Sequence, residues 1–230
     1  MSTESKTALF GGDQPWSPRD WTASDDQVRG GSSYSIFDCN ASSPTAFFHG
    51  HLDTQTLGGA GFASQRTTGE DRTWDLSHYD GLELDIGRSD GKTYTVTLKD
   101  TIPSKRPDGR DESTLSWEYD FRVLKREKIF VKWSDFKPTY RGKEQKDAKP
   151  LDLGNVKRIS LMARSFFDTQ EGDFFLEVHS IAASRTAIYQ DDTDYEWVSL
   201  DNYGEKGASS KHGQGMFEWL LETCGIIRGR

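Results

Sequence analysis

The sequence predicts an all-β fold: a jelly-roll type of β-sandwich, followed by an extended tail with one short helix. Apolar and polar residues alternate in many short runs, and turn-forming residues separate these runs. The apolar content is also rich in rings, with 12% aromatic residues against 33% hydrophobic residues in all, and rings favour strands over helix bundles. No clear helical pattern occurs before residue 185, which favours a sandwich over alternating strands and helices.

The clearest strand signals lie on both sides of one turn. Residues 82–86 and residues 94–98 each alternate apolar with polar side chains, as expected for strands with one buried face. Asp90-Gly91 lies between them, and this pair favours a tight turn because both residues tolerate positive φ. We therefore predict an antiparallel hairpin at the centre of the sandwich.

The residues before this hairpin predict irregular structure and then short strands. The opening segment is dense in Gly, Ser, Asp and Trp, and we expect Phe10, Trp16 and Trp21 to anchor it at one edge of the core. Strands are expected from Tyr34, over residues 45–52, and over residues 58–66, where glycines let another backbone pass closely.

Later runs bring the predicted total to eight or nine short strands, with two long basic loops at residues 101–113 and 137–150. The later strands are expected at residues 115–121, 129–133, 158–164 and 173–181. The tail contains an acidic cluster and a Gly/Ser-rich piece, and ends in a pattern typical of a short amphipathic helix near residues 215–224. The predicted domains are therefore the sandwich, residues 9–185, and the tail, residues 186–230.

Composition excludes several classes of protein. The formal net charge of −8 argues against a dedicated nucleic-acid binder. Cys39 and Cys224 are too few and too distant to indicate a disulfide framework or a zinc site, and they favour a reducing compartment. No apolar run approaches the roughly 18 residues of a membrane span. The first residues lack the pattern of a signal or transit peptide, which leaves a mature or recombinant start, or a cytosolic protein, as alternatives.

Two groups of residues are candidates for metal ligands, and each has a simpler interpretation. His49 and His51 place two imidazoles on one strand face, although no Cys or third His is near in sequence. Asp25 and Asp26 precede a Gly-Gly turn, as calcium-binding carboxylates do in some sandwich loops. Solvent-facing histidines and turn-forming aspartates are the simpler explanations, so no metal site is predicted.

Acidic residues supply the candidates for an enzyme. The carboxylates considered for glycoside hydrolysis are those of Asp100, Glu112, Glu118 and Asp120. Glu118 and Asp120 share one strand face, which in an antiparallel sheet is usually the solvated face. The sequence has no nucleophile elbow, phosphate-binding glycine loop or dinucleotide fingerprint in the required context. We predict a protein that is not an enzyme and binds no cofactor.

The two long loops are basic in an otherwise acidic chain. The first carries Lys105, Arg106 and Arg110, and the second carries Lys137, Arg141, Lys143, Lys146 and Lys149. A solvated surface is the simpler interpretation. The alternative is a patch that binds an acidic partner or anionic lipid headgroups.

Several segments, taken in order, resemble the complex I intermediate-associated protein 30 family. They are DDQVRGGSS, GAGFASQR, WDLSHYDGLELDIGRSDGKTYTVTLKD, WEYDF, IFVKWSDFKPTYRGK and VKRISLMARSFFDTQEGDFFLEVHSIAA, and they extend from Leu9 to Ala183. The resemblance implies a galactose-binding-like jelly roll, similar to carbohydrate-binding modules. It also implies a non-enzymatic scaffold for membrane-arm intermediates of mitochondrial respiratory complex I, with other assembly factors as further partners and a peripheral contact with the inner membrane.

Most positions that fit the family pattern are explained by folding, because they are turn glycines or core tryptophans. The residues that we expect a partner to contact are Arg66, Lys92, Lys105, Arg106, Arg110, Tyr140, Arg141 and Lys143. Two alternatives remain open. One is a carbohydrate-binding module, in which Tyr140, Trp117 or Trp16 stacks on sugar rings; the other is a cytosolic relative with a different protein client.

Overall fold

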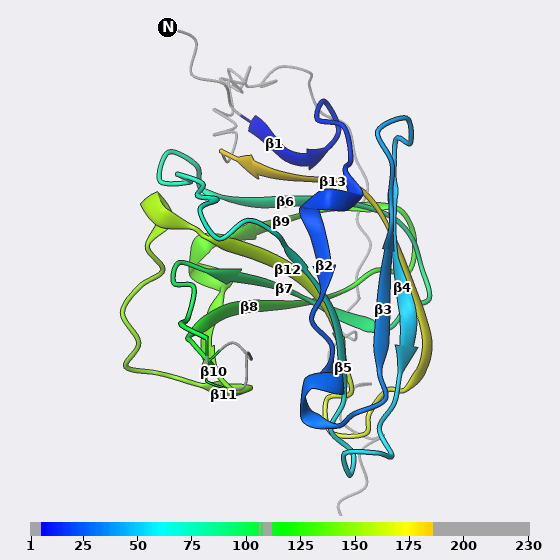
Figure 1. The fold of residues 1–230 in the computed structure, drawn as a ribbon. Coiled ribbons are helices and arrows are strands. Elements are labelled where there is room, and N and C mark those ends of the chain that lie inside the picture. Colours follow the sequence, from blue (N-terminus) through cyan, green and yellow to red (C-terminus); the bar gives the residue numbers. More distant parts are fainter. Residues whose placement is uncertain (1–5, 106, 108–111, 186–230) are drawn as a thin grey trace, which may run out of the picture. The chain divides into compact units, whose positions relative to one another are not determined.

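Two antiparallel sheets pack face to face in the computed structural model, which describes residues 6–105, 107 and 112–185 (Figure 1). The described residues form thirteen strands and four short 3₁₀ turns. The strands are β1 (Lys6–Gly11), β2 (Trp21–Ala23), β3 (Tyr34–Asp38), β4 (Ala46–Leu52), β5 (Phe62–Thr67), β6 (Gly81–Ser89), β7 (Thr93–Lys99), β8 (Ser116–Arg122), β9 (Glu127–Lys132), β10 (Lys137–Tyr140), β11 (Lys143–Glu144), β12 (Arg158–Arg164) and β13 (Gly172–Ser184). The 3₁₀ turns are η1 (Pro18–Asp20), η2 (Asp26–Arg29), η3 (Trp133–Asp135) and η4 (Leu153–Asn155). The predicted all-β sandwich is confirmed.

Each sheet joins strands that are distant in sequence. Sheet A has the order β3-β4-β13-β6-β9, and β1 also pairs with β13. Sheet B has the order β11-β10-β8-β7-β12-β5-β2. Strand β13 is 13 residues long and pairs with β4 and β1 along one edge and with β6 along the other, so it holds sheet A together.

The inward faces of the two sheets form one core. Leu82, Leu84 and Ile86 of β6 and alternate residues of β7, Tyr94, Val96 and Leu98, are all fully buried. At one edge, the ring centroids of Trp21 and Phe37 lie 4.4 Å apart, and those of Phe10 and Trp21 lie 4.9 Å apart. Phe10, Trp16 and Trp21 are all buried, which confirms their predicted role as anchors of the opening segment.

The predicted hairpin of residues 82–98 is wrong in its pairing. Strand β6 lies in sheet A between β13 and β9, and β7 lies in sheet B between β12 and β8. The Asp90-Gly91 turn therefore carries the chain from one sheet to the other. Alternation reports that a strand has one buried face, but two strands that bury their faces against each other across a core give the same pattern.

The number of strands also exceeds the predicted eight or nine, because several are too short to show alternation. Strand β2 has three residues and β11 has two. The predicted close approach in residues 58–66 is present at Gly61, where a Cβ atom would lie 2.1 Å from the carbonyl oxygen of Asp53. The chain divides into the units Met1–Ile188 and Tyr189–Arg230. The predicted tail, residues 186–230, and its helix lie outside the described residues and stay predictions.

Asp25 connects the two sheets. Its Oδ1 accepts hydrogen bonds from the Ser35 hydroxyl (2.6 Å) and the Ser64 N–H (2.7 Å), and its Oδ2 accepts one from the Ser35 N–H (3.0 Å). Ser35 belongs to β3 of sheet A and Ser64 to β5 of sheet B. Burial raises the pKa of Asp25 above its usual value, while the hydrogen bonds act in the opposite direction.

Asp26 repeats this arrangement one residue later. Its carboxylate accepts hydrogen bonds from the Ser33 N–H (3.0 Å), the Ser33 hydroxyl (2.7 Å) and the Phe62 N–H (3.0 Å). Its side chain is fully buried. The two aspartates therefore satisfy backbone donors of segments far apart in sequence, which is a structural use of the pair first considered for calcium.

We predict that Asp25→Asn lowers the free energy of unfolding by about 1–3 kcal/mol, because the amide NH₂ would face the N–H of Ser35 and leave that buried donor unsatisfied. Chemical denaturation of the purified chain measures the change. The matched control is Asp75→Asn at an exposed carboxylate that accepts from Ser77, where a change within about 0.5 kcal/mol is expected. Equal stability of Asp25→Asn and the native chain would contradict this role of the Asp25 side chain.

Candidate protein-interaction surface

Three of the predicted contact residues lie together in a short hairpin at the edge of sheet B. Strands β10 and β11 pair Thr139 with Glu144 and Tyr140 with Lys143. Arg141 and Gly142 form the connection, with φ values of 52° and 75°, as a two-residue hairpin turn requires. We call residues 137–144 the basic hairpin.

The side chain of Arg141 connects the two predicted basic loops. Its guanidinium carbon lies 5.4 Å from the ring centroid of Tyr140, and its Nε donates to Ser113 Oγ at 3.3 Å. Ser113 ends the first basic loop, so the end of that loop and the basic hairpin meet here. A hollow of about 470 Å³ lies beside them, lined by Leu115, Tyr140 and residues 144–148.

The other predicted contact residues lie apart from the basic hairpin or outside the residues that the structure describes. Lys105 Nζ is 3.8 Å from Glu70 Oε1, and both side chains are mostly exposed. Arg66 lies on β5, opposite Ser160 on one side and Thr22 on the other. Arg106 and Arg110 lie outside the described residues. The predicted set is therefore not a single site, and its contact role stays a prediction.

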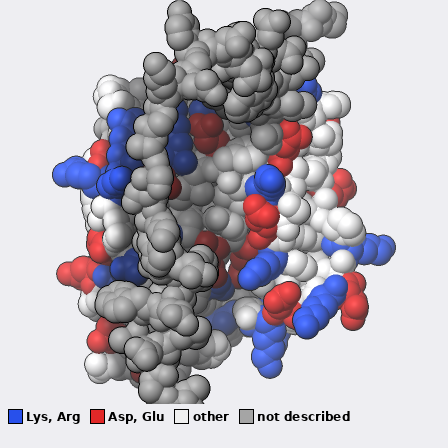
Figure 2. Space-filling view, turned by 180° about the vertical axis from the view of Figure 1, so that it is seen from behind, with Lys and Arg blue, Asp and Glu red and all other residues white. Residues whose placement is uncertain are grey.

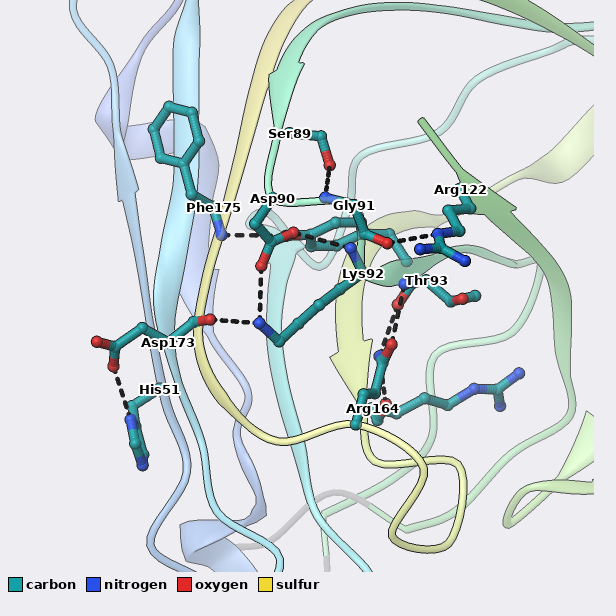
Figure 3. Close-up of polar contacts among 12 residues, drawn as sticks. His51, Ser89, Asp90, Gly91, Lys92, Thr93, Arg122, Arg164, Asp173 and Phe175 are labelled. Carbon is teal, nitrogen blue, oxygen red and sulfur yellow. Dashed lines mark hydrogen bonds and ion pairs between the residues drawn. The ribbon is translucent and has the colours of Figure 1, made fainter. Parts of the chain in front are cut away.

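Lys92 fastens the turn between the two sheets, as Figure 3 shows. Its Nζ donates to Asp90 Oδ2 at 3.0 Å and to the carbonyl oxygen of Asp173 at 2.6 Å. Its backbone N–H donates to Asp90 Oδ1 at 3.0 Å. The ammonium group thus already connects the β6–β7 turn to the start of β13.

Tyr94 supports the same turn from the core. Its hydroxyl donates to Asp90 Oδ1 at 2.8 Å and accepts the Phe175 N–H at 3.1 Å. Burial and the nearby Asp90 carboxylate raise the pKa of Tyr94 well above its usual value, so the hydroxyl remains a donor.

We predict that Tyr94→Phe lowers the free energy of unfolding by about 1–3 kcal/mol, because the Phe175 N–H and the Asp90 carboxylate both lose a partner. Denaturant titration measures it, with Tyr140→Phe at the 39% exposed ring of the basic hairpin as the control. The same loss in both variants would contradict a specific role for the Tyr94 hydroxyl.

The candidate metal ligands have other partners. His49 Nε2 lies 2.9 Å from Asp38 Oδ2, and His51 Nδ1 lies 2.7 Å from Asp173 Oδ1, so each imidazole faces a different carboxylate. Within the described ranges, no group of three or more His, Cys, Asp or Glu side chains is placed to hold a metal ion.

Two of the carboxylates considered for hydrolysis, those of Glu118 and Asp120, form ion pairs with an arginine. Arg164 of β12 reaches across β7 and donates to Glu118 Oε2 at 2.8 Å and to Asp120 Oδ1 at 2.6 Å. The Thr95 hydroxyl also donates to Asp120, at 2.6 Å. This arrangement is an ion-pair network on the outer face of sheet B. It differs from a catalytic pair, in which the two carboxyl groups flank space for a substrate.

Two of the three proposed sugar-stacking residues are buried. Trp16 is 1% exposed and Trp117 is 5% exposed, and both pack in the core. Their proposed role as sugar platforms is therefore wrong, because neither ring has a free face. Tyr140 alone of the three is exposed.

Sequence reasoning did not single out the turn between β12 and β13. Phe167 in this turn is 87% exposed, the largest value among the exposed large hydrophobic residues of the described chain. The available signal was the pair Phe166-Phe167, which continues neither the alternation of residues 158–164 nor that of residues 173–181.

The described surface is mixed in charge. Figure 2 shows acidic and basic side chains interspersed over the described part of one face. In the part of the chain that the structure covers, no helix has the length and apolar character needed to cross a membrane.

Comparison with solved structures defines the class of fold. The chain is similar to the family 11 carbohydrate-binding module of cellulosomal cellulase Lic26A-Cel5E of Clostridium thermocellum, with a TM-score of 0.52, 16% identity, and coverage of 80% of this chain and 96% of that chain. The Clostridium thermocellum family 11 module in complex with a beta-1,3-1,4-mixed-linked tetrasaccharide gives a TM-score of 0.50 and 16% identity, covering 80% and 98% of the two chains. The chain thus has the galactose-binding-like jelly-roll fold of such modules.

Sequence comparison defines the family. Residues 9–178 match the model of complex I intermediate-associated protein 30. The chain is also 43% identical over 182 residues to the uncharacterized protein C9E9.15 of Schizosaccharomyces pombe, with coverage of 76% of this chain and 82% of that protein. The chain belongs to the complex I intermediate-associated protein 30 family.

Proposed function

We propose that this protein is a non-enzymatic assembly factor that binds intermediates of mitochondrial respiratory complex I through the surface loops of its jelly roll. The match of residues 9–178 to the family carries this proposal. Its partners would be membrane-arm intermediates and other assembly factors. Its place would be the mitochondrial matrix, peripheral to the inner membrane.

The basic hairpin supports a protein-binding role. Tyr and Arg are the residue types most often found at energetic centres of interfaces. Here Arg141 is already held against Tyr140 and Ser113, so less side-chain freedom is lost when a partner binds. With Lys143 beside them, this surface favours an acidic protein partner.

The outer face of sheet B supports the non-enzymatic part of the proposal. Glu118 and Asp120 both hold Arg164, and that pairing favours a structural use of the carboxylates over acid–base catalysis.

We predict that the double variant Arg141→Glu/Lys143→Glu lowers recovery of complex I subunits by about tenfold or more, because it reverses two cations at the interface. Affinity purification from respiring cells, followed by mass spectrometry, measures recovery. The melting temperature should stay close to that of the native chain, since both residues are exposed.

The matched control is Lys125→Glu/Lys128→Glu, which makes the same change of charge at exposed positions near the opposite end of β8 from the basic hairpin. Its recovery of complex I subunits should equal that of the native chain. Equal losses in the two double variants would point to net charge and remove the hairpin as the contact.

The proposed location has its own test. Fractionation with protease protection should place the full chain inside mitochondria. Recovery in the cytosolic fraction would favour the alternative of a cytosolic relative with another protein client.

A carbohydrate-binding function is the second candidate, and it rests on the fold shared with a module that holds a tetrasaccharide. The burial of Trp16 and Trp117 counts against it. Calorimetric titration with the mixed-linked tetrasaccharide, with and without calcium, should give no binding heat. A saturable signal would favour the carbohydrate alternative.

A further inference from the structure

The turn between β12 and β13 concentrates backbone strain. Phe166, Phe167 and Asp168 have φ values of 46°, 56° and 71°, which is the left-handed region. Elsewhere in the described residues, Arg141 is the one other non-glycine residue with positive φ. A turn that only reversed the chain would carry Gly, Asn or Asp at these positions; Asp168 fits that pattern, but Phe166 and Phe167 do not, because a bulky side chain is disfavoured in this region. We call residues 166–168 the left-handed turn.

The base of this turn is fixed by Ser165, which is 3% exposed. Its hydroxyl donates to the Gly59 carbonyl oxygen at 2.9 Å and accepts the Gly61 N–H at 3.0 Å. Its own backbone N–H donates to the Gly61 carbonyl oxygen at 2.9 Å, and its carbonyl oxygen accepts the Thr169 N–H at 2.9 Å. The turn therefore begins from a residue tied to the loop before β5.

The other end of the turn is fixed by Gln170. Its side chain accepts the Thr93 N–H at 2.9 Å and donates to the Thr93 carbonyl oxygen at 2.8 Å and to the Arg164 carbonyl oxygen at 2.7 Å. Figure 3 shows that the chain between Arg164 and Asp173 forms a loop. The structure thus holds a strained turn in one position from both sides.

The two phenylalanines of the turn differ in their surroundings. Phe166 lies under the guanidinium of Arg164, whose carbon is 4.5 Å from the ring centroid, and Glu118 and Asp120 hold that guanidinium. Phe167 is 87% exposed. One ring therefore fastens the turn to sheet B, and the next is presented to the surroundings with its apolar surface unburied.

The residues that follow Phe167 line an acidic hollow. An open hollow of about 560 Å³ is lined by Thr54, Gln55 and residues 168–171, which include Asp168 and Glu171 and no basic residue. Asp53 precedes Thr54, and its hydrogen bonds with Thr56 lower its pKa below the usual value.

We propose that Phe167 is the anchor of a second protein-docking site: it enters an apolar pocket of a partner whose rim carries Lys or Arg facing Asp168 and Glu171. Aromatic side chains that fill pockets are typical centres of binding energy, and a turn whose backbone is held in advance loses little backbone freedom on binding. Asp168 and Glu171 disfavour an anionic lipid surface and favour a protein partner with basic residues. The proposal rests on the proposed function for the identity of that protein, a complex I intermediate or another assembly factor.

The test is Phe167→Gly in the full chain. Recovery of complex I proteins from respiring cells should fall by about tenfold or more, while the melting temperature stays equal or rises by about 2–4 °C. Glycine adopts the left-handed conformation without strain, so a loss of binding would come without a loss of stability. Leu124→Ala, at a 75% exposed leucine of the β8–β9 turn, is the control and should leave recovery unchanged.

Asp168→Asn tests the charge of the rim, because Asn keeps the tolerance for positive φ and removes the carboxylate. A smaller fall in recovery than for Phe167→Gly supports a basic rim on the partner. Recovery by Phe167→Gly equal to that of the native chain would overturn the docking site and leave the proposed function standing.

If the native chain itself recovers no complex I protein, the proposed function fails, and a photo-crosslinking amino acid at position 167 decides the docking site separately. A crosslink to a protein, mapped to an apolar pocket beside Lys or Arg, supports it. Crosslinks to lipid alone, no crosslink, or flotation with phosphatidylserine vesicles that Phe167→Gly abolishes would overturn it.

Discussion

The paired carboxylates of Asp25 and Asp26 form the interaction on which the loop end of this sandwich depends. Asp25 joins β3 of sheet A to β5 of sheet B, and Asp26 holds the N–H of Phe62. The residue before Phe62 is Gly61, which exchanges hydrogen bonds with Ser165 at the base of the left-handed turn. Two buried aspartate side chains near the start of the chain thus help to position a surface formed some 140 residues later.

The positions of the strands could be predicted from the sequence better than the pairing between them. Alternation identified the buried faces of β6 and β7 correctly, but a period of two says which face is buried and nothing of which strand lies beside it. The turn chemistry of Asp90-Gly91 was also recognised correctly. The Asp90 carboxylate, however, accepts hydrogen bonds from Lys92 and Tyr94 in a turn that connects the two sheets. Local residue types do not distinguish such a crossover from a hairpin.

The candidate surfaces were predicted only where charge marks them. The basic loops stand out in an acidic chain, although their meeting through Arg141 and Ser113 depends on the fold. Phe167 carries no charge that would mark it as part of a surface. Adjacent phenylalanines are typical of a core, and a left-handed turn is predicted from Gly or Asn rather than from Phe. The protein therefore presents two surfaces of opposite charge, and a jelly roll shared with sugar-binding modules does not by itself fix what is bound.

Strand β13 has a consequence for how the protein is made. It is the last described strand, yet β1, β4 and β6 all pair with it. Pairing between residues so distant in sequence is slow, because the entropy cost of closing a long loop comes before any stabilising contact forms. Sheet A therefore cannot close until β13 has left the ribosome, and until then β1, β4 and β6 lack the strand with which they all pair.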